Sequence, residues 1–387
     1  MMILGCKSAI YANQRGAVLI MALLIVALVT TIVVSVTWRF ELGMARNENR
    51  WHGVQARAYL EAGEGLASYA LKADYFIDQT EDRPWDDLTE EWAMPQPPFP
   101  TDEGWFRGSL EDAQGRINLN LLVYNEKYDP EKDPPHERYS SSQKRFLRLL
   151  QLMELEEGSF LDPDLATGIL DAISDWIDAD NETTGFYGAE ADYYDSLDPP
   201  YVIANREMAT ISELSMVKGI TPELFQMLEP YVSALPGPRA APIGAQPPQP
   251  VFTNLRTMKP ILMRTLNRKD VLEPLTEEEW LTMLQARGGP LPGMEESQLG
   301  NNAQPVPVGE FKTIEEFAEL PEVKAILGEA GDKGTFDGGE LVVRSRYFYL
   351  NTETLVGEQL RRGKSLLFRD LNKGGNTSVI RRTSANY

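Results

Sequence analysis

The sequence predicts an α+β protein in which a long N-terminal helix packs on an antiparallel sheet, with a large and mostly α-helical insertion between the strands. Three observations support this. An uncharged apolar segment near the N-terminus continues directly into an amphipathic helical pattern. Alternating β patterns occur at 104–123 and at 338–371, and helical periodicity dominates 124–320 between them. We therefore expect the two β-rich segments to close one sheet around an insertion domain.

The apolar segment, residues 17–38, contains no charged side chain. At 1.5 Å per residue it spans about 33 Å, which is enough to cross a hydrocarbon core of roughly 30 Å. We expect this segment to form a single transmembrane helix.

Residues 1–16 precede the apolar segment and end in Arg15-Gly16. This order resembles a type IV prepilin leader, which implies cleavage by a prepilin peptidase between Gly16 and Ala17. Lys7 and Arg15 are the only charges of the leader, so we expect it to stay in the cytoplasm and the rest of the chain to be exported. The alternative is a signal anchor that is never cleaved.

Prepilins of this kind mostly carry Glu at the fifth mature position, where it can pair with the terminal amine of a neighbouring subunit. This chain has Met21 there. A carboxylate at bilayer depth is costly without a partner, so its absence fits a subunit at the end of a filament.

Residues 39–72 continue the helical pattern as an amphipathic segment that needs a sheet to cover it. Residues 81–103 are Pro-rich and acidic, and we expect a loop. The Asp112-Ala113-Gln114-Gly115 sequence predicts a hairpin turn, and Gly357 and Gly363 are expected at turns or bulges, which gives four strands. Residues 372–387 are expected to form a mobile tail.

The insertion contains one helix that opens at Asp162-Pro163 and buries apolar residues through Ile177. Pro- and Gly-rich connectors are expected at 233–251 and 288–308. Further helices are predicted at 142–155, 210–217, 221–232, 276–286 and 312–327.

The chain has a net charge of −21, so binding to nucleic acid is not expected, because phosphate recognition needs clustered Lys and Arg. The single cysteine, Cys6, lies in the leader, so the mature protein can form no disulfide. An enzyme is not expected: of the two histidines, His52 lies on the stem helix and His136 lies in a Pro-rich stretch without a recognisable triad.

The segment ISDWIDADNETTGFYGAEADYY and the later DPPYVIANREMATISELSMVKGITPELFQMLEPYVSALP closely resemble the minor pseudopilin K family, general secretion pathway protein K of type II secretion systems. GRINLN and SRYFYL resemble its strands, and the likeness runs from Arg15 to about Asp370. It implies a pilin-like fold, an inner-membrane anchor with the C-terminal portion in the periplasm, and a place at the tip of the pseudopilus with minor pseudopilins I and J. It also implies calcium bound in the insertion.

Two other functions remain open. A minor pilin of a type IV pilus-like assembly would share the leader and the stem helix, although the insertion segment argues against it. A membrane-tethered periplasmic hydrolase would need a concave site that joins acids or His136.

The acidic residues of the insertion independently suggest a cation. Asp171, Asp175 and Asp178 lie on one helix face, and with Asp180 they crowd the helix C-terminus, where acids oppose the macrodipole. No Lys or Arg follows before Arg206, and oxygen ligands from a loop suit Ca²⁺. The alternative is a solvated acidic loop. The predicted ligands are Asp175, Asp178, Asp180, Glu190 and Asp192.

The segment 211–228 has the form of a helix-hairpin-helix, which can hold a phosphate at its Gly turn. Its base near the turn is Lys218 and its surroundings are acidic, so packing within the insertion is preferred. Four nearby aromatic residues could form a binding surface, but we expect them in the core: Trp176, Tyr193, Tyr194 and Tyr201.

Overall fold

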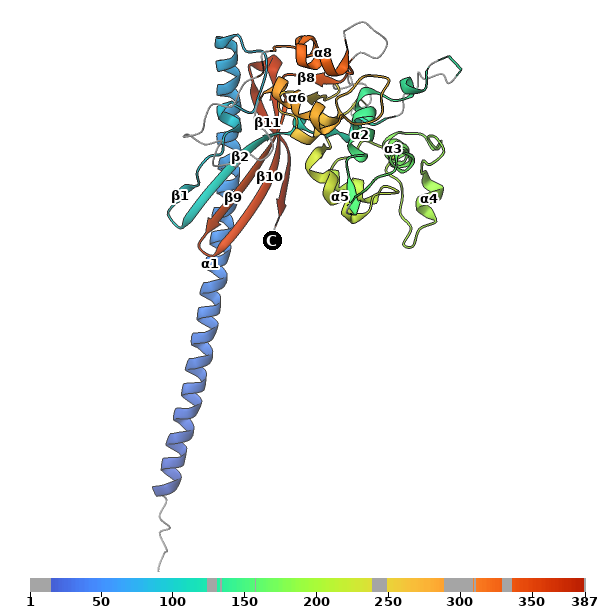
Figure 1. The fold of residues 1–387 in the computed structure, drawn as a ribbon. Coiled ribbons are helices and arrows are strands. Elements are labelled where there is room, and N and C mark those ends of the chain that lie inside the picture. Colours follow the sequence, from blue (N-terminus) through green and yellow to red (C-terminus); the bar gives the residue numbers. More distant parts are fainter. Residues whose placement is uncertain are drawn as a thin grey trace, which may run out of the picture.

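The computed structural model describes residues 15–123, 131–132, 134–156, 158–238, 249–288, 309, 311–328 and 336–385. A single long helix, α1 (Arg15–Glu81), forms a stem that extends far beyond the rest of the protein. The sheet lies beside the upper half of this stem, and the insertion projects from the sheet on the side away from α1 (Figure 1). The first fourteen residues of the expected leader lie outside the described part of the chain.

Helix α1 is 67 residues long and is the one helix of the described residues that is long and apolar enough to cross a membrane. It extends past the predicted end at residue 72. Residues 73–81 contain neither Gly nor Pro, and two of their carboxylates find partners in the head. The helix ends where Asp82 adopts a positive φ of 54° just before Arg83-Pro84.

The sheet has five antiparallel strands in the order β1-β2-β9-β10-β11. Helix α1 packs on one face, where Ala67 and Leu71 contact buried residues of the strands such as Phe348 and Leu367. A Cβ at Gly63 of α1 would lie 2.5 Å from Cζ of Phe106, so the close approach of helix and sheet requires glycine there. The strands are β1 (Phe99–Thr101), β2 (Gly104–Asp112), β9 (Tyr347–Val356), β10 (Gln359–Asp370) and β11 (Asn376–Ala385).

The predicted hairpin after Asp112 is wrong. Asp112 accepts a hydrogen bond from the Gln114 amide and starts a short 3₁₀ helix, Ala113–Gly115, that leads the chain out of the sheet. The following strand, β3 (Ile117–Asn118), pairs in parallel with β6 (Val232–Ser233) of the insertion. An Asp followed by a nearby Gly is compatible with a hairpin turn and with a turn that leads the chain out of the sheet. Pairing of β3 with β6, which is distant in the sequence, decides for the second.

The predicted mobile tail is also wrong, because residues 376–385 form the edge strand β11. It pairs with β10 from Asp370↔Asn376 to Arg362↔Ala385, after a turn at Gly374 and Gly375 with positive φ values of 64° and 70°. The small polar residues of this segment resemble a loop in composition. The strand predicted after Gly115 is not part of the sheet, whereas β11 and β1, which falls in the expected loop at 81–103, are added to it. The sheet therefore has five strands instead of the predicted four.

Glycines 357 and 363 differ in role. Gly357, with φ 57°, forms the turn between β9 and β10, as expected. Gly363 lies in the middle of β10 opposite Thr352, and a Cβ there would lie 2.9 Å from Oγ1 of Thr352. The irregularity in β10 occurs further along, between Leu366 and Leu367.

The insertion is mostly helical around its own core, in which Phe146, Trp176 and Leu228 are almost fully buried. The stretch predicted as one helix at 312–327 is two helices because Pro321 breaks it, and 210–217 is a 3₁₀ helix, Ile211–Met216. Its remaining elements are α2 (Ser141–Leu150), β4 (Glu154–Glu156), β5 (Ser159–Phe160), α3 (Pro163–Ile177), α4 (Ala191–Asp195), α5 (Pro222–Leu228), β7 (Thr253–Asn254), α6 (Glu277–Arg287), α7 (Ile314–Glu319), α8 (Pro321–Leu327) and β8 (Leu341–Val342).

Candidate functional site

The acidic loop between α3 and α4 brings three carboxylates together at the side of the insertion. Asp162 caps the start of α3, and the helix ends at Ile177, so that Asp178 is already extended. Oxygen atoms of Asp178, Asp180 and Glu190 all lie within 4.8 Å of one another. These are three of the five residues that the sequence predicts as ligands.

Asp175 occupies a different position from the other predicted ligands. It is fully buried, and its two oxygens accept hydrogen bonds from the amides of Thr184, at 2.8 Å, and Ala189, at 2.6 Å. Asp175 therefore fixes the backbone of the loop through these two hydrogen bonds. Asp192 is exposed on α4 and does not belong to the group of three.

The carboxylate of Glu190 lies in a buried and acidic environment. Its side chain is 7% exposed, and neither carboxylate oxygen has a hydrogen-bond partner among the described residues. Burial, together with the negative charge of Asp175, raises the pKa of Glu190 to about 7. A hard cation held by the three carboxylates would compensate this buried charge, which is the chemistry that the donor set fits.

Asp171 finds a partner that the sequence did not reveal. Arg138, which precedes α2, donates to Asp171 at 3.1 Å. Burial still raises the pKa of Asp171 to about 6, although the guanidinium lowers it. The negative charge of the acidic helix face is therefore compensated in part by Arg138, 33 positions earlier in the sequence. Only the carboxylates at the C-terminal end of the helix remain as candidates for a cation.

The helix-hairpin-helix segment supports the acidic loop from the other side. The ammonium of Lys218 donates to the carbonyls of Tyr187, at 3.1 Å, and Gly188, at 3.2 Å. Gly219, with φ 85°, packs against Ile169 of α3. Lys218 is thus engaged in holding the loop, which agrees with packing within the insertion.

The aromatic residues near the loop lie mainly in the core, as expected. Trp176 and Tyr194 are almost fully buried and meet edge to face with ring centroids 5.3 Å apart. The ring of Tyr201 packs at a tilt of 42° against that of Tyr194, and the Tyr201 hydroxyl donates to the carbonyl of Met216 at 2.7 Å. These contacts fix α3 against the segment that follows α4.

A second group of carboxylates lies at the far end of the stem and is held by arginine. Arg369 of β10 is fully buried and donates to Asp74 of α1 at 2.9 Å, to Asp86 and to the carbonyl of Ser345. We call this cluster the stem network. Its carboxyl groups are Asp74, Asp78, Asp86, Asp87 and Glu90, and its guanidinium groups are Arg83, Arg256, Arg344 and Arg369.

The stem network has one carboxyl group more than it has guanidinium groups. Burial and the neighbouring charge of Asp86 raise the pKa of Glu90 to about 9, while Arg83 and the indole of Trp92 donate hydrogen bonds to its two oxygens. Burial likewise raises the pKa of Asp78 to about 7. Oxygens of Asp74, Asp86 and Glu90 lie close enough to hold a metal, but Arg369 already bridges two of these carboxylates. The network therefore ties the stem to the sheet and, through Arg256, to the insertion.

A long N-terminal helix that is half apolar and half packed on an antiparallel sheet defines a pilin-like protein. A family model described as "Type II secretion system (T2SS), protein K" matches residues 115–237. Type II secretion system protein K of Aeromonas hydrophila is 33% identical over 248 residues, which cover 64% of this chain and 68% of that protein. The chain therefore belongs to the type II secretion system protein K family and is a minor pseudopilin of that system.

Other relatives agree over different lengths. The protein of Pseudomonas aeruginosa is 36% identical over 226 residues, which cover 58% of this chain and 63% of that one. A putative type II secretion system protein K of Escherichia coli K12 is 27% identical over 381 residues, covering 97% and 99% of the two chains.

The fold is confirmed by a solved structure, that of the GspK-GspI-GspJ complex from the type 2 secretion system of enterotoxigenic Escherichia coli. The TM-score is 0.62 at 20% sequence identity, and the match covers 88% of this chain and 100% of that one. The predicted α+β fold with a helical insertion is therefore correct.

Proposed function

We propose that this minor pseudopilin forms the tip of the pseudopilus in a complex with minor pseudopilins I and J. The observation that carries the proposal is the likeness over 88% of the chain to a protein solved in a GspK-GspI-GspJ complex. The insertion widens the head to one side of the stem, so it would interfere with further subunits stacked above it (Figure 1). The role is structural, in the export of folded proteins across the outer membrane.

The stem anchors the protein before assembly. Residues 17–38 are exposed along the whole circumference of α1, as a segment in lipid requires, and the head follows their C-terminal end. In our proposal the protein crosses the inner membrane once, the head lies in the periplasm, and prepilin peptidase removes residues 1–16.

Partner subunits pack along the part of α1 that the sheet leaves uncovered. Large apolar side chains are exposed there, among them Leu66 at 57%, Tyr69 at 74% and Ile77 at 47%. A row of this kind on a helix beside a sheet is typical of a protein interface.

Calcium fixes the acidic loop in this proposal. Asp178, Asp180 and Glu190 would supply the carboxylate ligands, while Asp175 positions the loop that carries Glu190. The buried and unpartnered oxygens of Glu190 support a cation at this place. The ion would order the loop and perform no chemistry.

The complex can be tested by co-expression of the full chain with minor pseudopilins I and J and purification from membranes in mild detergent. We expect all three proteins to elute together, and a chain that elutes without I and J would refute the proposal. A variant in which residues 124–320 are replaced by a short linker shows whether the stem and sheet alone bind I and J, or whether the insertion is needed.

The calcium site can be tested on the same full chain in detergent by metal analysis and by thermal unfolding with and without a chelator. We expect bound Ca²⁺ and a chelator-induced fall in Tm that the double variant Asp180→Asn/Glu190→Gln abolishes. Asp192→Asn is the matched control, because Asp192 lies outside the group of three, and it should behave as the parent protein does. No bound metal and an unchanged Tm would refute the site.

A further inference from the structure

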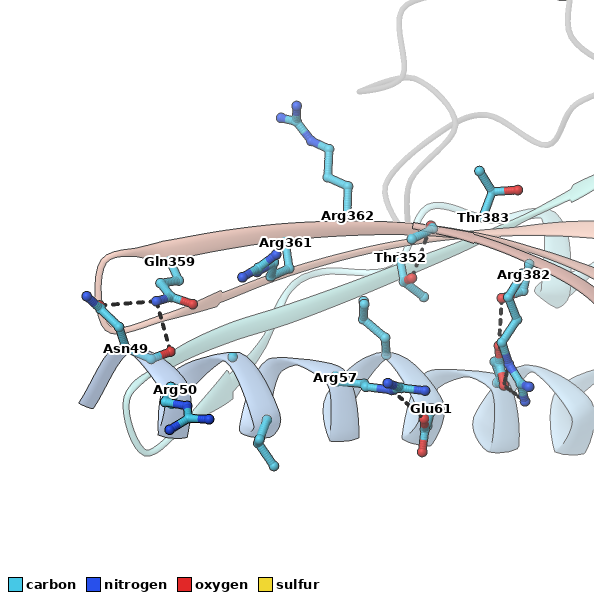
Figure 2. A pocket seen from close by; sticks show the side chains of 16 residues that line it. Asn49, Arg50, Arg57, Glu61, Thr352, Gln359, Arg361, Arg362, Arg382 and Thr383 are labelled. Carbon is cyan, nitrogen blue, oxygen red and sulfur yellow. Dashed lines mark hydrogen bonds and ion pairs between the residues drawn. The ribbon is translucent and has the colours of Figure 1, made fainter. Parts of the chain in front are cut away.

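A basic groove lies between α1 and the strands β10 and β11, at the end of the sheet nearest the apolar half of the stem. It is open to solvent and has a volume of about 760 Å³. Its lining includes Arg50 and Arg57 of α1, Arg361 and Arg362 of β10 and Arg382 of β11, and Figure 2 labels these residues. Such a concentration of guanidinium groups is unexpected in a chain with a net charge of −21.

The carboxylates of the basic groove do not balance these arginines. Glu64 is buried in its floor and is neutralised by Arg382, whose Nε and Nη2 donate to it at 2.8 and 2.7 Å. Glu61 pairs with Arg57 at 3.1 Å, but both side chains are more than half exposed, so the pair is weak. Arg50 has no ion pair among the described residues, so the groove carries excess positive charge.

The positive charge continues down the stem as a stripe. Arg39, Arg46, Arg50 and Arg57 follow one another at intervals of seven, four and seven residues. At about 100° per residue, these intervals keep all four within about 20° of one line along the helix. All four are exposed, and Glu41 and Glu48 lie on the opposite face. Intervals of seven and four are those at which one helix contacts another along its length.

We infer that the arginine stripe and the basic groove bind an acidic face of the stem helix of a neighbouring pseudopilin. This inference rests on the proposed function, which places such subunits beside this one. The partner's carboxylates are expected at matching intervals, about 10.5, 6 and 10.5 Å along its axis. The contact sets the register between the two stems, because complementary charges fix register and reject wrong partners.

The position of Arg50, Arg57 and the basic groove favours a protein partner over a lipid headgroup, whereas Arg39 directly follows the apolar segment and lies at headgroup depth. Arg50 lies 12 residues beyond Trp38, where the apolar segment ends, and therefore about 18 Å further along the helix. The headgroup layer on each side of a bilayer is only about 5–8 Å thick. Arg50, Arg57 and the groove thus lie beyond the headgroups of a membrane that the stem crosses.

The test is co-purification of full-length protein with minor pseudopilins I and J in detergent. The double variant Arg50→Glu/Arg57→Glu should retain at least about tenfold less of I and J than the parent, because it sets like charges against the acidic face. The matched control is Arg206→Glu/Lys373→Glu, which makes the same charge change at two exposed residues that do not line the groove. It should retain I and J as the parent does. Circular dichroism and Tm establish that both variants fold.

A second measurement identifies the occupant. The single cysteine of the chain lies in the leader, so Val54→Cys in the lining of the groove allows selective crosslinking. We expect crosslinks to the stem helix of I or J, close to its acidic residues. Crosslinks only between two copies of this chain would overturn the inference.

Each remaining outcome is also decisive. If the groove variant retains I and J as well as the control does, the inference falls while the proposed function stands. If the parent protein itself does not retain I and J, the proposed function falls and the inference falls with it. If the variant retains I and J but no longer binds vesicles that contain anionic phospholipid, the groove is a lipid site and the inference is overturned.

Discussion

Arg369 offers the most direct test of how the head is held on the stem. Its side chain is fully buried at the centre of the stem network, where it donates to Asp74 at 2.9 Å, to Asp86 and to the carbonyl of Ser345. Arg369→Met replaces the guanidinium by a shorter, flexible and uncharged side chain. The change leaves two carboxylates without their guanidinium partner in a buried site.

Loss of one partner of a buried ion pair costs about 3–5 kcal/mol, because the remaining charge is uncompensated. For a domain of this size, about 2–4 °C of Tm corresponds to each kcal/mol, so we expect Tm to fall by about 6–20 °C. The full chain in detergent can be followed by circular dichroism. Adding Asp86→Asn to Arg369→Met should recover part of the loss, because it removes one of the stranded charges.

Arg107→Met is the matched control for this prediction. Arg107 pairs with Glu353 at 3.0 Å on the exposed face of the sheet, where an ion pair contributes less than about 1 kcal/mol. Its Tm should change by only a few degrees. If Arg369→Met and Arg107→Met lower Tm equally, the stem network does not hold the head, and the reasoning from buried charge is refuted.

Further predictions concern pH and packing on α1. The pKa of Asp78 is raised to about 7 in the folded state, so the folded protein takes up a proton at Asp78 as pH falls and becomes more stable. Between pH 8 and pH 6 the free energy of unfolding should rise by about 1 kcal/mol from this group. Denaturant titrations at the two pH values should show this rise in the parent protein and not in Asp78→Asn. A variant that keeps the full pH slope would refute the assignment to Asp78. Gly63→Ala should cost about 1–3 kcal/mol, because its Cβ would meet the ring of Phe106. Gly65→Ala, with no atom within 4 Å of the added Cβ, should instead stabilise the helix by up to about 1 kcal/mol, and equal effects of the two changes would contradict the packing.

The parts of the fold that the sequence predicts well are those set by local periodicity. The apolar run of residues 17–38 and the helical pattern after it need no distant partner to be recognised, and the same is true of the cap and Pro that open α3. The sequence does not predict strand β11, because its residues alternate only weakly and the strand forms by pairing with the free edge of β10. The turn geometry at Asp112 suits two different connections, so the sequence alone does not decide between them.

The candidate cation site shows the same limit at the level of side chains. Spacing alone groups Asp175 with Asp178 and Asp180, because all three lie near the end of one helix. The fold separates them, since the returning loop donates two amides to Asp175 and leaves the others facing Glu190. The partners of Asp171 and of the stem network come from segments far away in the sequence, and no local pattern announces an ion pair of this kind.

Polar contacts fix helix α1 to the sheet at both ends of the sheet. At the end of the sheet near the apolar segment, the side-chain amide of Gln359 donates to the backbone and side-chain oxygens of Asn49, each at 3.1 Å. At the other end, Arg369 pairs with Asp74 and Arg344 pairs with Asp78. A pull along the helix axis, such as extraction from a bilayer would exert, is therefore shared between two anchor points and loads the sheet in shear. We expect the subunit to travel as a rigid unit, with no peeling of the helix from the strands.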